Sequence, residues 1–62
     1  MGLRDFRIAK GLTLSQVGAK LHVATSTVCL WEKGVRRPKL KNVLALSKLY
    51  GVGVGKIAKA VA

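Results

Sequence analysis

Three consecutive hydroxyl side chains, Thr25, Ser26 and Thr27, open a short apolar pattern in the middle of the chain. The pattern stops at Gly34, and a basic segment, VRRPK, follows at once. Hydroxyl groups donate or accept hydrogen bonds at the base edges of a nucleic acid, and Arg and Lys side chains bind phosphate oxygens. Two such segments in so short a span suit a helix that lies in a groove of double-stranded DNA.

The hydroxyl run has a structural alternative, because Ser and Thr also favour helix starts, where their oxygens accept hydrogen bonds from free backbone N–H groups. Leu30, one turn further along, is either a contact for a thymine methyl group or a partly exposed apolar residue. No Arg, Gln or Asn lies within 25–33, so the usual bidentate partners of guanine and adenine are missing. We therefore expect modest direct discrimination between bases, with DNA shape supplying much of the specificity.

The basic segment places cations where a helix disfavours them. Four of them surround Pro38 and the expected start of a further helix: Arg36, Arg37, Lys39 and Lys41. Cations oppose the helix dipole at an N-terminus, so the arrangement costs stability unless an anion neutralises it. A phosphate group would turn this cost into a binding site that also uses free backbone amides. A solvated charged loop is the alternative.

The charge of the whole chain is one-sided. Twelve Lys and Arg residues face only Asp5 and Glu32, which gives a formal net charge of +10 over 62 residues. The hydrophobic share is 50%, so the chain can pack and is not a disordered basic tail. Like charges at this density oppose a compact state, and a polyanionic partner explains why they are tolerated. Nucleic acid is the first candidate and an anionic membrane the second.

Residues for catalysis or metal binding are scarce. One His, one Cys and two carboxylates supply neither a nucleophile with its base and orienting group nor a metal-ligand cluster. His22 is interpreted as a turn residue, and Cys29 is expected on the outer face of its helix, with the core as the alternative. No cofactor motif or small-molecule site is evident, and we expect no enzyme. The lone thiol and the short apolar runs predict a soluble intracellular protein with a single domain, residues 1–62.

Glycines and turn signals divide the chain into five amphipathic segments, and no strand pattern appears. The first expected helix starts at about Leu3 and ends before Gly11, the second follows Thr13 and ends near Leu21, and the third runs from around Thr25 to before Gly34. The fourth covers about 40–50 and is closed by Gly51, and a short last helix follows the glycine-rich segment and includes Val54, Ile57, Ala58 and Val61. Thr13 and Gln16 have the spacing of a capping box at the start of the second helix. Trp31 is expected in the core. The fourth helix is expected to turn five residues inward: Leu40, Val43, Leu44, Ser47 and Tyr50.

The ordered set of these residues resembles the Cro/C1-type (XRE-like) helix-turn-helix family of phage repressors and small bacterial regulators. The resemblance covers about residues 3–58, and its most specific part is the segment WEKGVRRP. It is carried by Leu12, Thr13, Val17, Leu21, His22, Val23, Ser26, Thr27, Val28, the segment 31–34, Arg37, Pro38, Leu40, Val43, Leu46, the segment 50–52 and Ile57. It implies an all-α fold, a compact five-helix, lambda-repressor-like DNA-binding domain with its helix-turn-helix core at about 13–33.

The resemblance also implies which residues bind DNA. In this family the helix at about 25–33 lies in the major groove with its first residues at the base edges. The implied base contacts are Thr25, Ser26, Thr27 and Leu30. The implied phosphate contacts are Thr13, Lys33, Arg36, Arg37, Lys39, Lys41 and Asn42. Lys33 also suits the last turn of a helix without any phosphate.

Two further positions, Arg7 and Glu32, match an internal ion pair that is common in this family. We expect the pair to tie the first helix to the helix at 25–33, with Glu32 buried or half-buried.

The chain departs from the family pattern near several helix ends. Gly18 stands where Ala is usual, which costs helix stability. His22 stands where Gly usually takes the left-handed conformation. Ala24 replaces the usual hydroxyl cap, so that Thr25 is expected to take over as the cap. Lys39 and Gly53 replace good caps further along.

The resulting interpretation is a sequence-specific, Cro-like repressor of transcription that binds a palindromic operator as a homodimer. It would act at the nucleoid, in the cytoplasm of a bacterial or phage-infected cell. Val52, Val54 and an exposed Leu49 are candidate dimer contacts. Two alternatives stay open, a nonspecific or architectural nucleic-acid-binding protein and a cationic membrane-active peptide. The one long helix that the last alternative needs is interrupted at Gly11, Gly34, Pro38 and Gly51.

Overall fold

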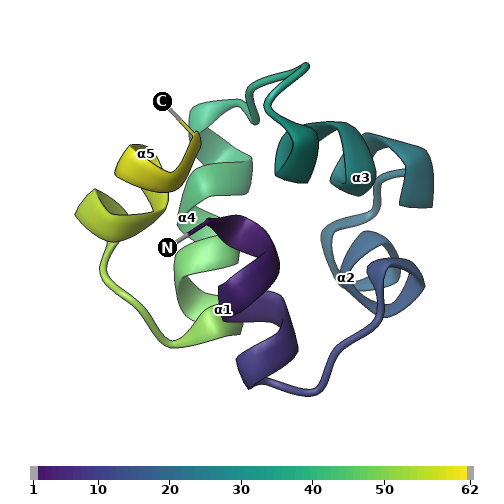
Figure 1. Ribbon diagram of the computed structural model, residues 1–62, viewed down its shortest axis with the longest axis horizontal. Coiled ribbons are helices and arrows are strands. Elements are labelled where there is room, and N and C mark those ends of the chain that lie inside the picture. The colour runs from purple at the N-terminus through teal and green to yellow at the C-terminus, as the bar shows by residue number, and fades with distance from the viewer. Residues whose placement is uncertain (1, 62) are drawn as a thin grey trace.

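The computed structural model describes residues 2–61 and contains five helices and no strand in that range. In chain order they are α1 (Leu3–Ala9), α2 (Leu14–Leu21), α3 (Thr25–Lys33), α4 (Leu40–Tyr50) and α5 (Val54–Val61). α4 and α5 pack against each other with α1 in front of them, and α2 and α3 form a second pair on the other side (Figure 1). The all-α, five-helix fold expected from the sequence is confirmed.

Most helix ends follow local signals in the sequence. At the start of α2, the Gln16 amide donates to the Thr13 Oγ1 at 3.1 Å and the Thr13 amide donates to the Gln16 Oε1 at 2.8 Å, which completes the capping box. α2 ends at His22, whose φ of 59° and ψ of 41° are left-handed. Gly34 and Gly51 end α3 and α4 in the same conformation, which a residue without a Cβ adopts freely.

α3 begins without a side-chain cap. Ala24 occupies the N-cap position in an extended conformation, and no side chain accepts a hydrogen bond from the first turn. The expectation that Thr25 takes over as the cap is wrong, because Thr25 is already the first helical residue. The amides of Thr25 and Ser26 donate to no backbone group within 2–61, so they stay free for a partner outside the helix.

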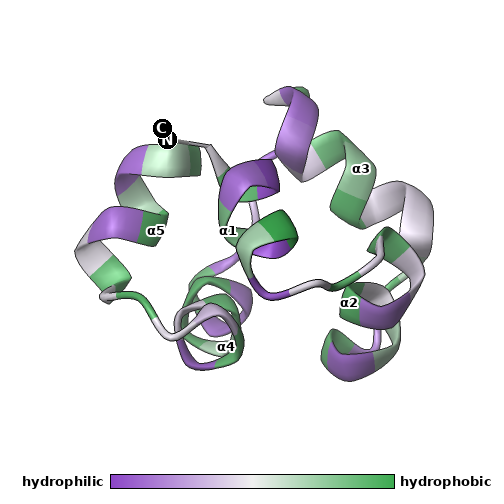
Figure 2. Cartoon of the chain, turned by 60° about the horizontal axis from the view of Figure 1, so that its bottom comes forward, coloured by the Kyte–Doolittle hydropathy of each residue, from purple (hydrophilic) through white to green (hydrophobic). Residues whose placement is uncertain are grey.

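One hydrophobic core holds the five helices together. Trp31 is 4% exposed, which confirms its expected place in the core. The largest fully buried side chains come from four different helices: Leu46, Ile57, Val17 and Val28. Figure 2 shows both hydrophobic and hydrophilic residues along every helix, as packing by one face requires.

α4 uses only part of the face expected from the sequence. Its buried residues are Val43, Leu46 and Tyr50, which share one face through spacings of three and four residues. Leu40 is 70% exposed and Leu44 is 47% exposed, so their expected inward positions are wrong. Val43 and Tyr50 are buried and Ser47 is half-buried, as expected, and packing against α2 and α5 places Leu46 on this face in place of Leu40 and Leu44.

The turn between α2 and α3 brings two backbone segments together at Gly18. The Val23 amide donates to the Gly18 carbonyl at 2.9 Å. A Cβ added to Gly18 would stand 2.8 Å from the Val23 carbonyl oxygen, closer than real Cβ atoms come to another atom. Gly18 therefore has a packing role that its low helix propensity does not reveal.

Candidate nucleic-acid interface

The first turn of α3 presents free hydroxyl groups to solvent. Thr25 and Ser26 are exposed and Thr27 is half-buried. None of the three hydroxyls forms a hydrogen bond with a residue in the described range. Because Ala24 fills the cap position, capping does not occupy these hydroxyls, and they are available to donate to and accept from base edges. Leu30 is half-buried one turn further along.

A hollow of about 250 Å³ lies between α3 and the start of α4, and we call it the basic hollow. Its lining consists of Val23, Thr27, Trp31, Arg36, Arg37, Pro38, Lys39, Lys41 and Asn42. Five of the seven residues expected to contact phosphate thus meet in one place, next to one expected base contact, Thr27. No carboxylate lines the hollow. Its four cations therefore face outward without neutralisation, which favours an anionic partner.

The N-terminus of α4 adds backbone donors to the same place. Lys39 is the N-cap and makes no side-chain cap hydrogen bond. The amides of Leu40 and Lys41 donate to no backbone group in the described part of the chain. The first turn of a helix carries partial positive charge, and the neighbouring Lys and Arg side chains increase it. A phosphate oxygen here would receive hydrogen bonds from backbone and side chains together.

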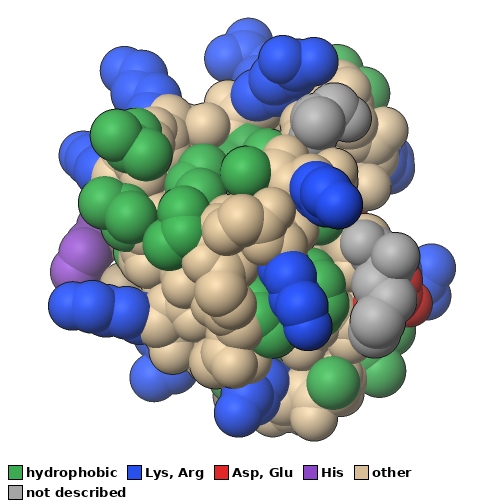
Figure 3. Space-filling view, turned by 90° about the vertical axis from the view of Figure 1, so that its left-hand side faces the viewer, with side chains coloured by type: hydrophobic (Ala, Val, Ile, Leu, Met, Phe, Trp, Pro, Cys, Tyr) green, Lys and Arg blue, Asp and Glu red, His purple; other side chains and the backbone are tan. Residues whose placement is uncertain are grey.

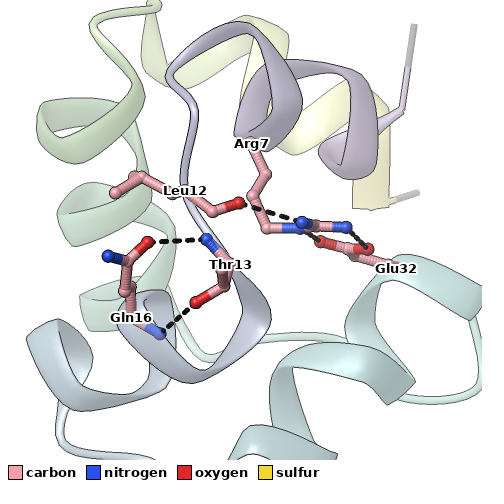
Figure 4. A network of polar contacts seen from close by, with 5 residues as sticks. All are labelled: Arg7, Leu12, Thr13, Gln16 and Glu32. Atoms are coloured by element: carbon pink, nitrogen blue, oxygen red, sulfur yellow. Dashed lines mark hydrogen bonds and ion pairs between the residues drawn. The ribbon is translucent and has the colours of Figure 1, made fainter.

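Arg7 and Glu32 form an ion pair that ties α1 to α3 (Figure 4). The Arg7 Nε donates to the Glu32 Oε2 at 2.7 Å and the Arg7 Nη2 to the Glu32 Oε1 at 3.3 Å. The Arg7 Nη1 also donates to the Leu12 carbonyl at 2.9 Å, which fixes the segment before α2. The side chains are only 13% and 9% exposed. The hydrogen bonds that Arg7 donates to the Glu32 carboxylate raise the pKa of Arg7, so the guanidinium stays charged and the contact holds α3 in place.

The remaining expected phosphate contacts lie outside the basic hollow. Thr13 is exposed at the start of α2, and its oxygen already accepts the capping hydrogen bond. Lys33 lines a second hollow of about 350 Å³ together with Arg4, Arg7 and Cys29. Cys29 is half-buried there, so it lies neither on an outer face nor in the core. Arg4 was not among the expected site residues, although its spacing of three residues from Arg7 on one helix indicates a shared face.

In the range 2–61, no three His, Cys, Asp or Glu side chains are grouped so that they could hold a metal ion. None of the five helices has the length and apolar character to cross a membrane.

Comparison with known proteins gives a family and two relatives. A family profile described as helix-turn-helix matches residues 3–57. The transcriptional repressor RstR of the cryptic phage CTXphi from Vibrio cholerae is 34% identical over 55 residues, which cover 89% of this chain and 50% of that protein. The HTH-type transcriptional activator BcrR of Enterococcus faecalis is 27% identical over 55 residues, 89% of this chain and 27% of that protein. The chain thus spans half or less of the length of these curated relatives. No solved structure matches it.

Proposed function

The chain belongs to the Cro/C1-type helix-turn-helix family, and from this premise we propose that it is a sequence-specific regulator of transcription that binds double-stranded DNA. α3 lies in the major groove, and the base contacts come from Thr25, Ser26, Thr27 and Leu30. The phosphate contacts come from Thr13, Lys33, Arg36, Arg37, Lys39, Lys41 and Asn42.

The observation that carries this proposal is the basic hollow beside the free first turn of α3. Thr27 belongs to both, because it lines the hollow and stands in the hydroxyl run. A single duplex can therefore place a phosphate in the hollow while its bases face Thr25 and Ser26. Phosphate contacts fix the register of a protein on DNA, and base contacts then supply the sequence preference.

The proposal extends to a homodimer on a palindromic operator, acting as a repressor. A recognition helix of 9 residues offers few base contacts, and two symmetric half-sites double them. One relative is named a repressor and the other an activator. The repressor is the more similar of the two, and its phage origin favours the cytoplasm of a bacterial or phage-infected cell as the place of action.

Selection from a random duplex library, at about 0.15 M salt, tests the proposal directly. Enrichment of a short palindrome would support a dimeric regulator and give the spacing of its half-sites. Retention of DNA without any enriched sequence would contradict sequence-specific binding, and no retention at all would remove DNA as the partner.

Three variants separate the assigned roles. Arg37→Ala is expected to weaken binding to all sequences alike and to lower the salt slope of the affinity by about 1, because it removes one phosphate contact. Ser26→Ala is expected to change which bases are enriched. Lys56→Ala, in α5 on the side of the molecule away from α3, is the matched control for lost charge and is expected to leave the half-site affinity unchanged (Figure 1).

One observation favours a second candidate function, a nonspecific or architectural nucleic-acid-binding protein. α3 has the sequence TSTVCLWEK and contains no Arg, Gln or Asn. These are the usual side chains that form bidentate hydrogen bonds with guanine or adenine. The same selection distinguishes this candidate, because it would retain DNA without enrichment. The membrane-active peptide is less well supported, since the longest described helix has 11 residues and packs through one face. Liposome binding without DNA binding would instead favour the membrane-active peptide.

A further inference from the structure

Two residues of α3, Ser26 and Leu30, lie on the side of the helix that is turned away from the core. They are four residues apart, so they lie one above the other on the helix surface. Each is two residues from the buried Val28, and at about 100° per residue this spacing places both nearly opposite the core. We call Ser26 and Leu30 the outer pair. Neither of them lines the basic hollow or the second hollow.

The two hollows lie on opposite flanks of the outer pair. Thr27 and Trp31 of α3 line the basic hollow, whereas Cys29, Glu32 and Lys33 line the second one. At about 100° per residue, the first two positions follow the outer pair in one direction around the helix and the other three follow it in the opposite direction. The outer pair is therefore the middle of the surface that α3 presents between the hollows.

The second hollow is positively charged, as the basic hollow is. Arg4, Arg7 and Lys33 line it, and the one carboxylate of its lining, Glu32, is paired with Arg7 (Figure 4). The major groove is about 12 Å wide and has a phosphate backbone along each edge, and a helix with its side chains is about 10–12 Å across. With a cationic hollow on each flank, α3 fits between the two backbones, and the outer pair then faces the base edges.

Leu30 has no role in the core that accounts for an apolar side chain at this position. It is half-buried, but within residues 2–61 it is not one of the half-buried side chains that pack against the core. Its carbonyl accepts hydrogen bonds from the amides of Val35 and Arg36 at 3.1 and 3.4 Å, so the backbone that carries it is held in place. Leu30 is thus an apolar group, carried by a fixed backbone, on the side of α3 that faces the bases in the proposed complex.

The major groove offers one apolar group, the C5-methyl group of thymine. The polar base readers of α3 are missing, engaged or unselective. No Arg, Gln or Asn is present, and Glu32, which would otherwise accept from the amino group of cytosine, is held by Arg7. Ser and Thr hydroxyls bond to several bases, and Lys33 lies in the last turn, beyond the residues that face base edges. The thymine methyl group is therefore the feature by which this helix best distinguishes base pairs.

We propose that Leu30 reads the C5-methyl group of a thymine, so that the preferred half-site carries an A·T pair opposite Leu30. The proposal rests on the proposed function and names what one of its base contacts recognises. Burial of one methyl group against Leu30 favours thymine about fourfold over a base that lacks only this group. A preference of that size agrees with a recognition helix that has no bidentate reader.

Deoxyuridine, which lacks only the methyl group of thymidine, supplies the first test. In a duplex that carries one half-site enriched by the selection, each thymine is replaced in turn by deoxyuridine, and the affinity is measured by fluorescence anisotropy. The wild type is expected to lose affinity about fourfold at one position.

Three variants assign this loss to a side chain. Leu30→Ser is expected to bind the thymine and deoxyuridine duplexes equally, whereas Leu30→Met, which is apolar and of similar volume, is expected to retain the preference. Leu44→Ser changes a leucine of α4 that is 47% exposed and lines neither hollow, so it is the matched control and is expected to keep the wild-type affinity and preference. Because the preference is a ratio of two affinities of one protein, a partly unfolded variant still reports it.

Cytosine and 5-methylcytosine at the same position separate the methyl group from DNA shape. The wild type is expected to bind the 5-methylcytosine duplex about fourfold more tightly than the cytosine duplex, and Leu30→Ser is expected to bind them equally. An enriched half-site without thymine, equal affinity for thymine and deoxyuridine at every position, or a preference that survives in Leu30→Ser would overturn the role of Leu30 while sequence-specific binding stands. If the selection enriches no sequence, the proposed function fails and the role of Leu30 fails with it.

Discussion

Arg7 and Glu32 are the residues on which the position of the recognition helix depends most directly. The ion pair joins α1 to α3, and the third hydrogen bond of Arg7, to the Leu12 carbonyl, extends the link to the start of α2. The side chains are largely buried, so neither charge is well solvated if its partner is removed. One of the two carboxylates of the chain is therefore used to orient α3 and contributes no negative charge at the candidate DNA interface.

Replacing Glu32 by Ala is expected to lower the free energy of unfolding by about 3 kcal/mol, because it leaves the Arg7 guanidinium buried without a counter-charge. Urea denaturation followed by circular dichroism measures the loss. Asp5→Ala, which removes the other carboxylate from an exposed position on α1, is the control and is expected to cost less than about 1 kcal/mol. Equal losses in the two variants would show that the buried ion pair contributes no more to stability than an exposed carboxylate does.

Tyr50 is a buried residue whose ionisation makes stability depend on alkaline pH. Burial, and to a smaller extent the Glu32 carboxylate, raise the pKa of Tyr50 to about 12, against about 10 in an unfolded chain. The folded state thus holds the phenol proton more tightly than the unfolded state does. The stabilisation is fully present below pH 10 and is lost as the pH rises from about 10 to about 12, by on the order of 2–3 kcal/mol.

Tyr50→Phe is expected to abolish this part of the alkaline loss. Lysines titrate in the same range, so the measured quantity is the difference in unfolding free energy between wild type and variant at each pH. That difference is expected to change steadily in favour of the variant above pH 10. A difference that stays constant up to pH 12 would contradict the assignment to Tyr50.

At the scale of the helices, the turn between α2 and α3 combines two departures from the family pattern. Gly18 lets the Val23 carbonyl approach the α2 backbone, and His22 takes the left-handed conformation that glycine adopts more easily. The close approach and the strained turn lie four residues apart. They set the angle at which α3 leaves α2, and so decide where the hydroxyl run points.

Two glycine substitutions are expected to act in opposite directions. Gly18→Ala removes a residue with low helix propensity but forces a Cβ to 2.8 Å from a backbone oxygen. It is expected to destabilise the protein by about 1–2 kcal/mol. Gly55→Ala, in α5, meets no atom within 4 Å and is expected to stabilise by about 0.5–1 kcal/mol through helix propensity alone. Thermal melts of both variants measure the change in stability. If both substitutions stabilise the protein, the turn between α2 and α3 relaxes around the added Cβ without loss of stability.

The helix boundaries were predictable because they depend on local chemistry. The capping box of Thr13 and Gln16, and the glycines at 34 and 51, act within one turn of the residues that they affect. The inward face of α4 was not predictable in the same way. Two overlapping stripes have helical spacing, and only the positions of α2 and α5 select Leu46 over Leu40 and Leu44. The close approach at Gly18 depends on tertiary structure for the same reason.

The candidate site also has one part that the local sequence predicts and one part that depends on tertiary structure. The cations around Pro38 are visible in the sequence because they are adjacent to one another. Their union with Thr27 and Trp31 requires the start of α4 to line the same hollow as α3, which no local signal encodes. The expectation that Leu49 is exposed is wrong, since Leu49 and Val52 pack against the core. Val54, the third candidate dimer contact, is 40% exposed.

At the scale of the whole molecule, positive charge is not confined to the candidate DNA interface. Figure 3 shows Lys and Arg side chains spread over the side formed by α4 and α5. Three exposed lysines of these helices do not line the basic hollow: Lys48, Lys56 and Lys59. The formal net charge of +10 is carried by a body whose Cα atoms span only 24 Å in the longest direction. At about 0.01 M salt the Debye length is about 30 Å, so every cation repels every other across the whole protein.

Salt alone is therefore expected to stabilise the fold. Raising NaCl from about 0.01 M to about 0.1 M shortens the Debye length to about 10 Å, and we expect the melting temperature to rise by about 5 °C. Lys56→Glu/Lys59→Glu lowers the net charge by two units per substitution, from +10 to +6, and is expected to show a clearly smaller rise. Equal rises in wild type and variant would assign the salt effect to something other than net charge. A smaller rise in the variant would show that repulsion among cations opposes folding, so a polyanion that binds the chain also stabilises it.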